Sequence, residues 1–221
     1  MSIWKKNTYL NISYNNTSFS SNEFPTQDGM YEDKYDSKYG LGLQYGKTFL
    51  FHKKPIGDVL FIGLDYTGID LNYNVFEKSD PAPQYFRGER TPYNLPWHNK
   101  KLSLDYAMMA GPSLTIYPFT ALGYDATDRI RIQLYYHLGY NVGMTFVKDV
   151  EEKKGELGTD HELGHGFLTS FGFNVTWDFV GIGYESRRAS RNRVQSVDDD
   201  YKSSSIDTKQ TTNRIYLQFR F

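Results

Sequence analysis

Alternation of apolar and polar residues with a period of two is the dominant pattern along the chain. It is clearest in GFLTSFGFNVTWDF, where every second residue from Phe167 to Phe179, except Thr169, is apolar. Small and polar residues occupy the positions between them. Because successive side chains of a β-strand point to opposite sides, this period predicts strands with one apolar and one polar face.

The alternation recurs along the whole chain, and no stretch has the period of a long helix. The third segment changes phase near Gly68, which predicts a β-bulge at that glycine. The expected strands are residues 3–19, 38–52, 58–77, 101–119, 129–148, 165–179, 180–191 and 212–221.

The connections between these segments alternate in length, so long loops collect at one end of an up-and-down meander. The fold class predicted is all-β: one domain over residues 1–221, forming an eight-stranded antiparallel up-and-down barrel. Both chain ends are expected at the end with short turns. The long external loops are expected at about 20–37, 78–100, 149–164 and 192–211.

Alternation alone does not tell whether the apolar face points into the barrel. A soluble barrel of the lipocalin type points it inward around a ligand, whereas a membrane barrel points it outward against lipid. The polar face of this chain combines charged residues with many glycines, which leave room for long side chains in a narrow interior. Long loops at one end and short turns at the other are also typical of outer-membrane barrels. Both features favour the membrane orientation, and a soluble ligand-binding barrel is the alternative.

Charged side chains inside a closed barrel must be paired with one another, so the outward orientation predicts a polar network in the lumen. A polar conducting path is the alternative interpretation of the same residues. The predicted lumen residues are Asp65, Asp105, Arg131, His137, Glu185 and Arg220.

Aromatic residues on the apolar face are expected to form a girdle at the membrane interface of the short-turn end. The predicted girdle residues are Phe49, Phe51, Tyr136, Trp177, Phe179 and Phe221.

The eight amphipathic segments and the terminal RIYLQFRF resemble the small outer-membrane β-barrels of the OmpA/OmpX type. The chain-terminal Phe221 on an alternating strand is similar to the signal read by the outer-membrane insertion machinery. YGLGLQYGKTF and YAMMAGPSLTIYPF resemble barrels of Bacteroidetes-type outer membranes in style. The resemblance implies a bacterial outer-membrane location after removal of a signal peptide, with outer-membrane lipid, the insertion machinery and another outer-membrane protein as partners.

Composition narrows the functional classes further. A net charge of −1 provides no basic field for nucleic acid, so no nucleic-acid partner is expected. The chain has no cysteine, which excludes disulfides and thiolate metal sites. No cofactor is expected.

The stretch TDHELGHGF points to a different function, because His161 and His165 have the H-E-x-x-H spacing of zinc proteases. That spacing brings both imidazoles to one metal only on a helix. Glycines surround the motif, and on an extended strand the two histidines lie about 13 Å apart. We therefore expect no metal site, and we interpret Gly164 and Gly166 as the point where a loop enters the sixth strand.

A lipid-modifying outer-membrane enzyme is the remaining catalytic alternative. The deacylases among such enzymes are marked by a His-x-Ser pair, and this chain has none, since His137 is followed at that spacing by Gly139 and His165 by Phe167. The prediction is a non-enzymatic barrel with a structural or interaction role.

The loop around residues 78–100 is the predicted contact surface for a partner protein or surface ligand. Four prolines stiffen it, and exposed aromatic side chains beside arginines are typical of contact surfaces. Packing of the loop over the barrel mouth is the alternative. The expected contact residues are Tyr85, Phe86, Arg87, Arg90, Tyr93 and Trp97.

Overall fold

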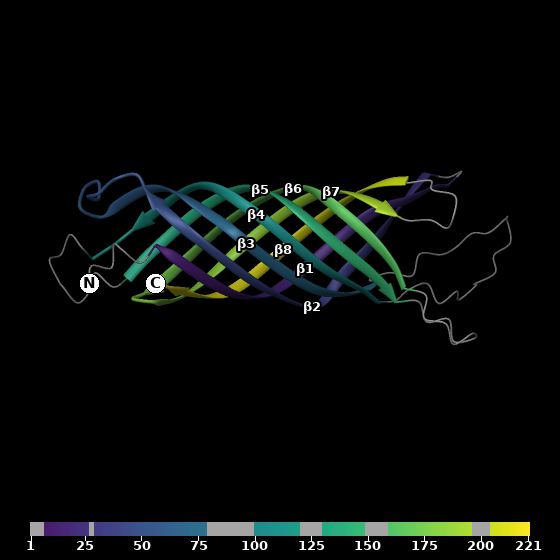
Figure 1. Cartoon of the computed structure of the whole chain (residues 1–221), viewed down its shortest axis with the longest axis horizontal. Coiled ribbons are helices and arrows are strands. Elements are labelled where there is room, and N and C mark those ends of the chain that lie inside the picture. Colours follow the sequence, from purple (N-terminus) through teal and green to yellow (C-terminus); the bar gives the residue numbers. More distant parts are fainter. Residues whose placement is uncertain (1–6, 27–28, 79–99, 120–129, 149–158, 196–203) are drawn as a thin grey trace.

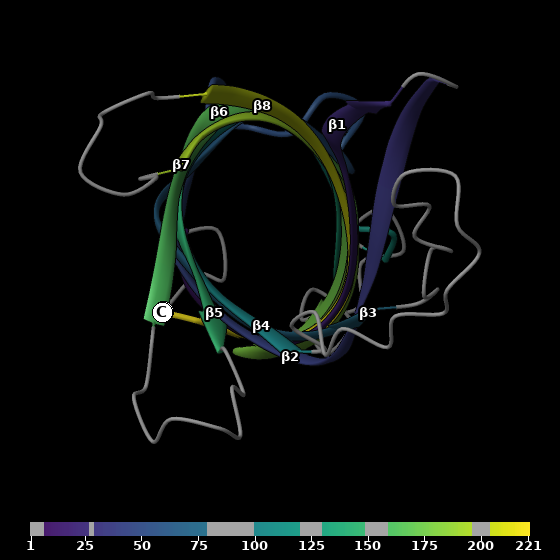
Figure 2. The same cartoon turned by 90° about the vertical axis from the view of Figure 1, so that its right-hand side faces the viewer.

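Eight antiparallel strands close into one barrel, which confirms the predicted fold class (Figures 1 and 2). The computed structural model describes residues 7–26, 29–78, 100–119, 130–148, 159–195 and 204–221. Each strand pairs with the next, and the first pairs with the last, so the sheet has no unpaired edge. The strands are β1 (Thr8–Thr26), β2 (Gly29–Leu50), β3 (Leu60–Lys78), β4 (Lys100–Ile116), β5 (Ile130–Lys148), β6 (Thr159–Trp177), β7 (Val180–Gln195) and β8 (Ser204–Arg220).

The pairing register sets the tilt of the strands. A path that steps from partner to partner around the barrel leaves β1 at Asn11 and returns to it at Ser21, a stagger of ten residues (21 − 11 = 10). With strands ~4.8 Å apart and a rise of ~3.3 Å per residue, this stagger corresponds to a tilt of about 40°. The path passes in order through Gln44, Asp70, Ala107, Asn141, Gly166, Arg191 and Thr208.

The strands extend further on the long-loop side than the alternation predicts. β1 and β2 pair from residue 20 to residue 37, so most of the loop expected there is strand. β6 and β8 likewise begin inside the loops expected at 149–164 and 192–211. In the sequence of these extensions polar residues occupy consecutive positions. The alternation of apolar and polar residues is therefore lost, although the backbones of the strands remain paired.

Gly68 lies in a bulge of β3, as predicted. Between Thr67 and Asp70 the register with β4 shifts, so two residues of β3 oppose one residue of β4. Asp65 and Asp70 are five positions apart, and on an unbroken strand they would point to opposite sides. The bulge turns both carboxylates into the lumen, where they are 2% and 0% exposed.

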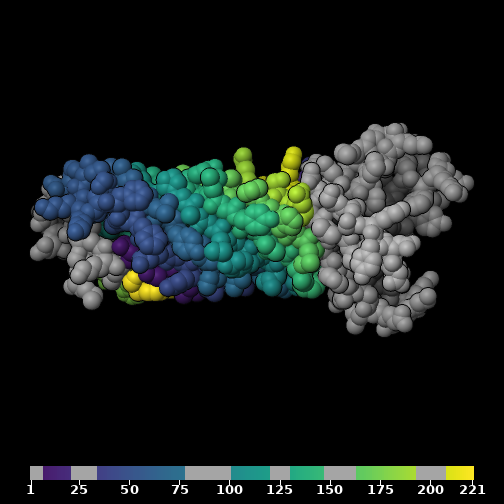
Figure 3. All heavy atoms as spheres, turned by 45° about the horizontal axis from the view of Figure 1, so that its top comes forward, coloured from purple at the N-terminus to yellow at the C-terminus, as the bar shows by residue number. Residues whose placement is uncertain are grey.

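The barrel is polar inside and mainly apolar outside. Its outer side chains form a continuous surface along the strands (Figure 3). Leu138 is 60% exposed and Phe167 77%, whereas the charged residues Glu185 and Arg214 are 0% and 1% exposed. A soluble barrel would require the opposite arrangement, so the soluble ligand-binding alternative is wrong. Among the described residues, no helix has the length and apolar character needed to cross a membrane.

Inward tyrosines lie over glycines of neighbouring strands. A Cβ atom at these glycines would collide with the tyrosine ring that lies above them, so glycine provides the space for the ring. This explains why glycines share the polar face with large side chains. The three pairs are Tyr9 over Gly46, Tyr135 over Gly172 and Tyr216 over Gly183.

Candidate functional site

Two carboxylates and two guanidinium groups form a central ion cluster inside the barrel. Arg187 Nη1 donates to Asp70 Oδ1 over 3.1 Å, and Arg214 Nη1 lies 3.2 Å from Asp70 Oδ2. Arg187 also pairs with Glu185, which lies 3.8 Å from Arg214. Asp70 belongs to β3 whereas the other three belong to β7 and β8, so the cluster bridges opposite walls of the barrel.

Neutral side chains complete the hydrogen bonding of the central cluster. Gln44 donates to Asp70 over 2.7 Å, and the Tyr135 hydroxyl donates to Glu185 over 2.7 Å. The Tyr216 hydroxyl lies 3.1 Å from that of Tyr135. Two positive charges are therefore balanced by two negative charges with further donors around them, the condition under which buried ions are tolerated.

A second group of residues, the lower cluster, surrounds Asp65 nearer the short-turn end. The carboxylate of Asp65 accepts hydrogen bonds from Tyr9 over 2.6 Å and from Gln133 over 3.1 Å, and it lies 3.1 Å from His137 Nε2. Arg220 lies over the Tyr9 ring at 5.3 Å and donates to Gln133. The lower cluster consists of Tyr9, Thr48, Asp65, Arg131, Gln133, His137 and Arg220.

Aromatic side chains fill the lumen at both ends of this network. On the long-loop side Phe19 stacks on Tyr35 with ring centroids 4.7 Å apart, Phe76 packs edge-on against Phe19, and Lys101 lies 4.4 Å from the Tyr35 ring. At the other end Phe61 and Tyr117 pack edge to face, and both are almost fully buried.

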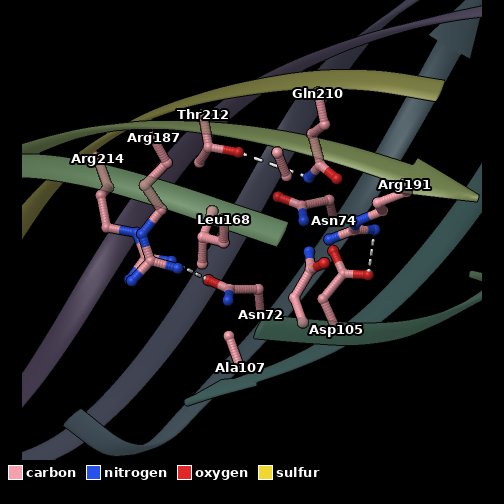
Figure 4. Close-up of a pocket in the computed structure, with 12 residues that line it drawn as sticks. Asn72, Asn74, Asp105, Ala107, Leu168, Arg187, Arg191, Gln210, Thr212 and Arg214 are labelled. Atoms are coloured by element: carbon pink, nitrogen blue, oxygen red, sulfur yellow. Dashed lines mark hydrogen bonds and ion pairs between the residues drawn. The ribbon is translucent and has the colours of Figure 1, made fainter. Parts of the chain in front are cut away.

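A small cavity remains above the central cluster (Figure 4). Arg191 donates to Asp105 over 2.7 Å at its wall, and Arg214 donates to Asn72. Its free space holds about one water molecule. The described part of the lumen is therefore largely filled by side chains.

All six lumen residues expected from the sequence are buried, but the structure distributes them over separate groups. Asp65, Arg131, His137 and Arg220 belong to the lower cluster and Glu185 to the central cluster, whereas Asp105 pairs with Arg191. Sequence reasoning missed four charged members of the network. These are Asp70, Arg187, Arg191 and Arg214.

The predicted girdle residues all point outward, with exposed fractions between 45% and 69%. Tyr136 does not lie at the short-turn end, because it pairs with Phe171 in the interior of β5 and β6. The alternation identifies the face of a residue but not its height on the barrel, which explains this error. The other five lie at or next to strand ends on the short-turn side. They are Phe49, Phe51, Trp177, Phe179 and Phe221.

The H-E-x-x-H stretch lies inside β6 and not on a helix. The expectation that it marks a loop boundary is wrong, because β6 begins at Thr159 and the outward residue Leu163 precedes Phe167. His165 also points outward, and its Nδ1 lies 2.6 Å from the Tyr140 hydroxyl. Over the described residues, no three histidine, aspartate or glutamate side chains are grouped to hold a metal ion.

His137 is the one described histidine with a carboxylate partner, Asp65, and it pairs in register with Ser170. An aspartate, a histidine and a serine are the components of a hydrolytic triad. However, His137 Nδ1 and Ser170 Oγ have no hydrogen-bond partner, and all three residues are at most 2% exposed inside the packed lumen. This trio therefore offers no site that a substrate could enter.

The structure is similar to solved outer-membrane β-barrels. The outer membrane protease OmpT from Escherichia coli has 9% identity and a TM-score of 0.48, with 97% of each chain covered. The outer membrane protein OprG from Pseudomonas aeruginosa has 13% identity and a TM-score of 0.42, covering 97% of this chain and 96% of that one. Neisserial surface protein A has 12% identity and a TM-score of 0.39, with 97% of each chain covered. No protein-family model matches the sequence, and no curated protein matches it.

Removing the carboxylate charge of Asp70 tests the role of the central cluster. The substitution Asp70→Asn leaves two buried guanidinium groups with one carboxylate, so we expect the free energy of unfolding to fall by about 3–5 kcal/mol. Urea titration of the barrel in detergent micelles measures this change.

The matched control is Glu77→Gln, which removes a carboxylate from the exposed pair that Glu77 forms with Lys38 at 3.1 Å. Because exposed pairs contribute little, we expect a loss of less than about 1 kcal/mol. Equal effects of the two substitutions would show that the central cluster does not hold the barrel together.

Proposed function

We propose that the protein is an integral barrel of the bacterial outer membrane with a structural and interaction role, and that it is not an enzyme. The observation that carries this proposal is the polarity of the closed barrel, with paired charges in the lumen and apolar side chains on the outer wall. Exposure of this apolar wall to water would be unfavourable, whereas contact with lipid would stabilise the barrel. Closure also leaves no unpaired backbone edge, which lipid requires.

The height of the apolar wall supports a membrane position. On β5 the outward positions from Ile130 to Phe146 are mainly apolar. With a rise of ~3.3 Å per residue and a tilt of about 40°, this run is about 40 Å high. A barrel in an outer membrane needs an apolar band of only about 25 Å. The barrel would therefore cross the membrane and continue beyond it on the long-loop side.

The packed lumen supports a role as an anchor in place of a channel. Aromatic groups close the described lumen at both ends, and the ion clusters occupy the space between them. An anchor of this kind leaves recognition to its loops. We propose that the loop residues Tyr85, Phe86, Arg87, Arg90, Tyr93 and Trp97, which lie outside the described residues, bind a partner protein or a surface ligand.

Outer-membrane lipid and the insertion machinery are the other proposed partners. The outward residues in the last part of β8, toward the short turns, are Ile215, Leu217 and Phe219, and Phe221 follows them with 60% of its surface exposed. The apolar face of this strand can contact the insertion machinery before insertion and lipid after insertion.

The membrane proposal predicts that the protein requires detergent for extraction and migrates differently on gels before and after heating in SDS. A barrel whose backbone bonds close on themselves resists SDS at room temperature, so the unheated protein migrates as a compact species. A monomer that remains soluble without detergent would contradict the proposal.

The loop proposal predicts that a triple variant, Phe86→Ala, Arg87→Gln and Trp97→Ala, loses a partner that the wild type retains after cross-linking in native outer membranes. Large aromatic and arginine side chains dominate binding at contact surfaces, so retention should fall at least tenfold. Mass spectrometry of the captured material measures it.

Heat-dependent migration of the triple variant provides the folding control. Lys54→Gln in the short β2–β3 connection is the matched surface control, and it should leave retention unchanged. A folded triple variant that captures the same material as the wild type would assign this loop to packing over the barrel mouth.

A further inference from the structure

The outer faces of β7, β8 and β1 change character abruptly halfway along the barrel. Because these strands are neighbours, their outward residues form cross-strand rows of three. The three rows nearest the short-turn end are entirely apolar. They are Val180–Phe219–Leu10, Ile182–Leu217–Ile12 and Tyr184–Ile215–Tyr14.

The next three rows toward the long-loop side contain only polar residues, and we call these nine residues the polar face. At the border, the Tyr184 hydroxyl donates to Asn213 over 2.9 Å. All nine side chains are exposed or half-buried. The rows are Ser186–Asn213–Asn16, Arg188–Thr211–Ser18 and Ser190–Lys209–Ser20.

The opposite side of the barrel does not share this change. On β5 the outward apolar run extends 16 positions from Ile130 to Phe146, whereas on β8 it extends six positions from Phe221 to Ile215. At about 2.5 Å of height per residue, these runs are about 40 Å and 15 Å high. Both start from the short-turn end, so the polar face begins far below the upper limit of the apolar wall.

This difference places the polar face at the depth of lipid headgroups. An apolar slab of about 25 Å, measured from Phe221, reaches approximately Thr211. Arg188 and Lys209 occupy the rows at this level, and neither forms an ion pair with any described residue. A cation at the boundary of the hydrocarbon is stabilised by an anionic headgroup.

One outward cation at this end has an anionic partner within the chain. Lys38 on β2 lies 3.1 Å from Glu77 on β3, with side-chain exposed fractions of 58% and 43%. The polar face contains no acidic side chain, and its two charged residues are both cations. Within the described residues neither Arg188 nor Lys209 has an anionic partner, so both can pair with an anionic group of a ligand.

We propose that the polar face binds the phosphorylated headgroup of a glycolipid in the outer leaflet, an inference that rests on the proposed membrane location. Arg188 and Lys209 pair with its phosphates, because charge-assisted hydrogen bonds to phosphate favour these side chains. The hydroxyl and amide side chains of the same rows hydrogen-bond to its sugar. Its acyl chains lie against the apolar rows directly below, which end at Tyr184 and Tyr14.

A second copy of the chain fits the polar face less well. A symmetric dimer places the same face of two copies against each other, so Arg188 and Lys209 would meet the same cations without a carboxylate. Like charges at an interface oppose association. A lipid with both phosphates and acyl chains matches the cationic rows and the apolar rows together.

The test measures glycolipid that remains bound when the protein is released from phosphatidylcholine nanodiscs that contain a diphosphorylated glycolipid. Native mass spectrometry counts the adducts. We expect wild type to retain the glycolipid and the double variant Arg188→Gln, Lys209→Gln to retain about tenfold less, since two charge-assisted contacts are lost. Lys38→Gln is the matched control and should retain as much as wild type.

Three further arms separate the possible results. The same glycolipid without phosphates should be retained as weakly as in the double variant, and inorganic phosphate should not displace the intact lipid. The inference would be overturned if wild type and the double variant retained the glycolipid equally, or if the dephosphorylated lipid were retained equally. It would also be overturned if inorganic phosphate displaced the lipid, or if the protein formed a dimer that depends on Arg188 and Lys209. Failure of wild type to insert into nanodiscs would instead overturn the proposed membrane location, and heat-dependent migration shows whether each variant is folded.

Discussion

The pairing of buried charges across the lumen is the interaction on which the rest of the barrel depends. A narrow barrel with apolar residues outside has only its inward residues to fill the centre, and the charges there are stabilised by ion pairs and hydrogen bonds. Asp70 on β3 meets Arg187 and Arg214 on β7 and β8, and Asp105 on β4 meets Arg191 on β7. These contacts join strands that share no backbone hydrogen bonds. The bulge at Gly68 makes the central contact possible, since it turns Asp70 inward together with Asp65.

Because side chains fill the interior, the surfaces left for binding are the long-loop end and the outer wall. The long-loop end can vary without disturbing the clusters below it, because the aromatic group of Phe19, Tyr35 and Phe76 separates the two regions. The outer wall is the second surface, and it is not uniform around the barrel. Its apolar part is tall on β5 and short on β8, so in the proposed membrane location two sides of the same barrel would meet different layers of a bilayer. Anchoring and recognition can therefore use different strands of one sheet.

Much of the fold and part of the candidate site follow from the period of two. Parity along each strand places Asp105, His137 and Glu185 inside, and the same parity, applied from Glu185 and Arg220, would also have found Arg187, Arg191 and Arg214. To predict Asp70 as a lumen residue, the alternation after Gly68 would have to be continued in its new phase. The partners could not be predicted, because which charges meet across the lumen depends on the ten-residue stagger, and pairing rather than composition sets it. The height of a residue on the barrel, such as that of Tyr136, could not be predicted for the same reason. The ends of the strands could not be predicted where polar residues occupy both faces.

The alternation of lipid-facing and lumen-facing residues is the central claim, and the absence of native cysteine makes a direct measurement simple. The measurement uses the single variants Leu138→Cys and Leu217→Cys, each with a nitroxide label on the cysteine, in lipid vesicles. A labelled Lys38→Cys variant is the water-exposed reference on the long-loop side. Both outward positions are exposed in the structure, at 60% and 53%. We predict that these two labels collide frequently with dissolved oxygen and rarely with a water-soluble nickel chelate, whereas the reference label contacts the chelate freely. Frequent contact of the chelate with the labels at 138 and 217 would contradict the account.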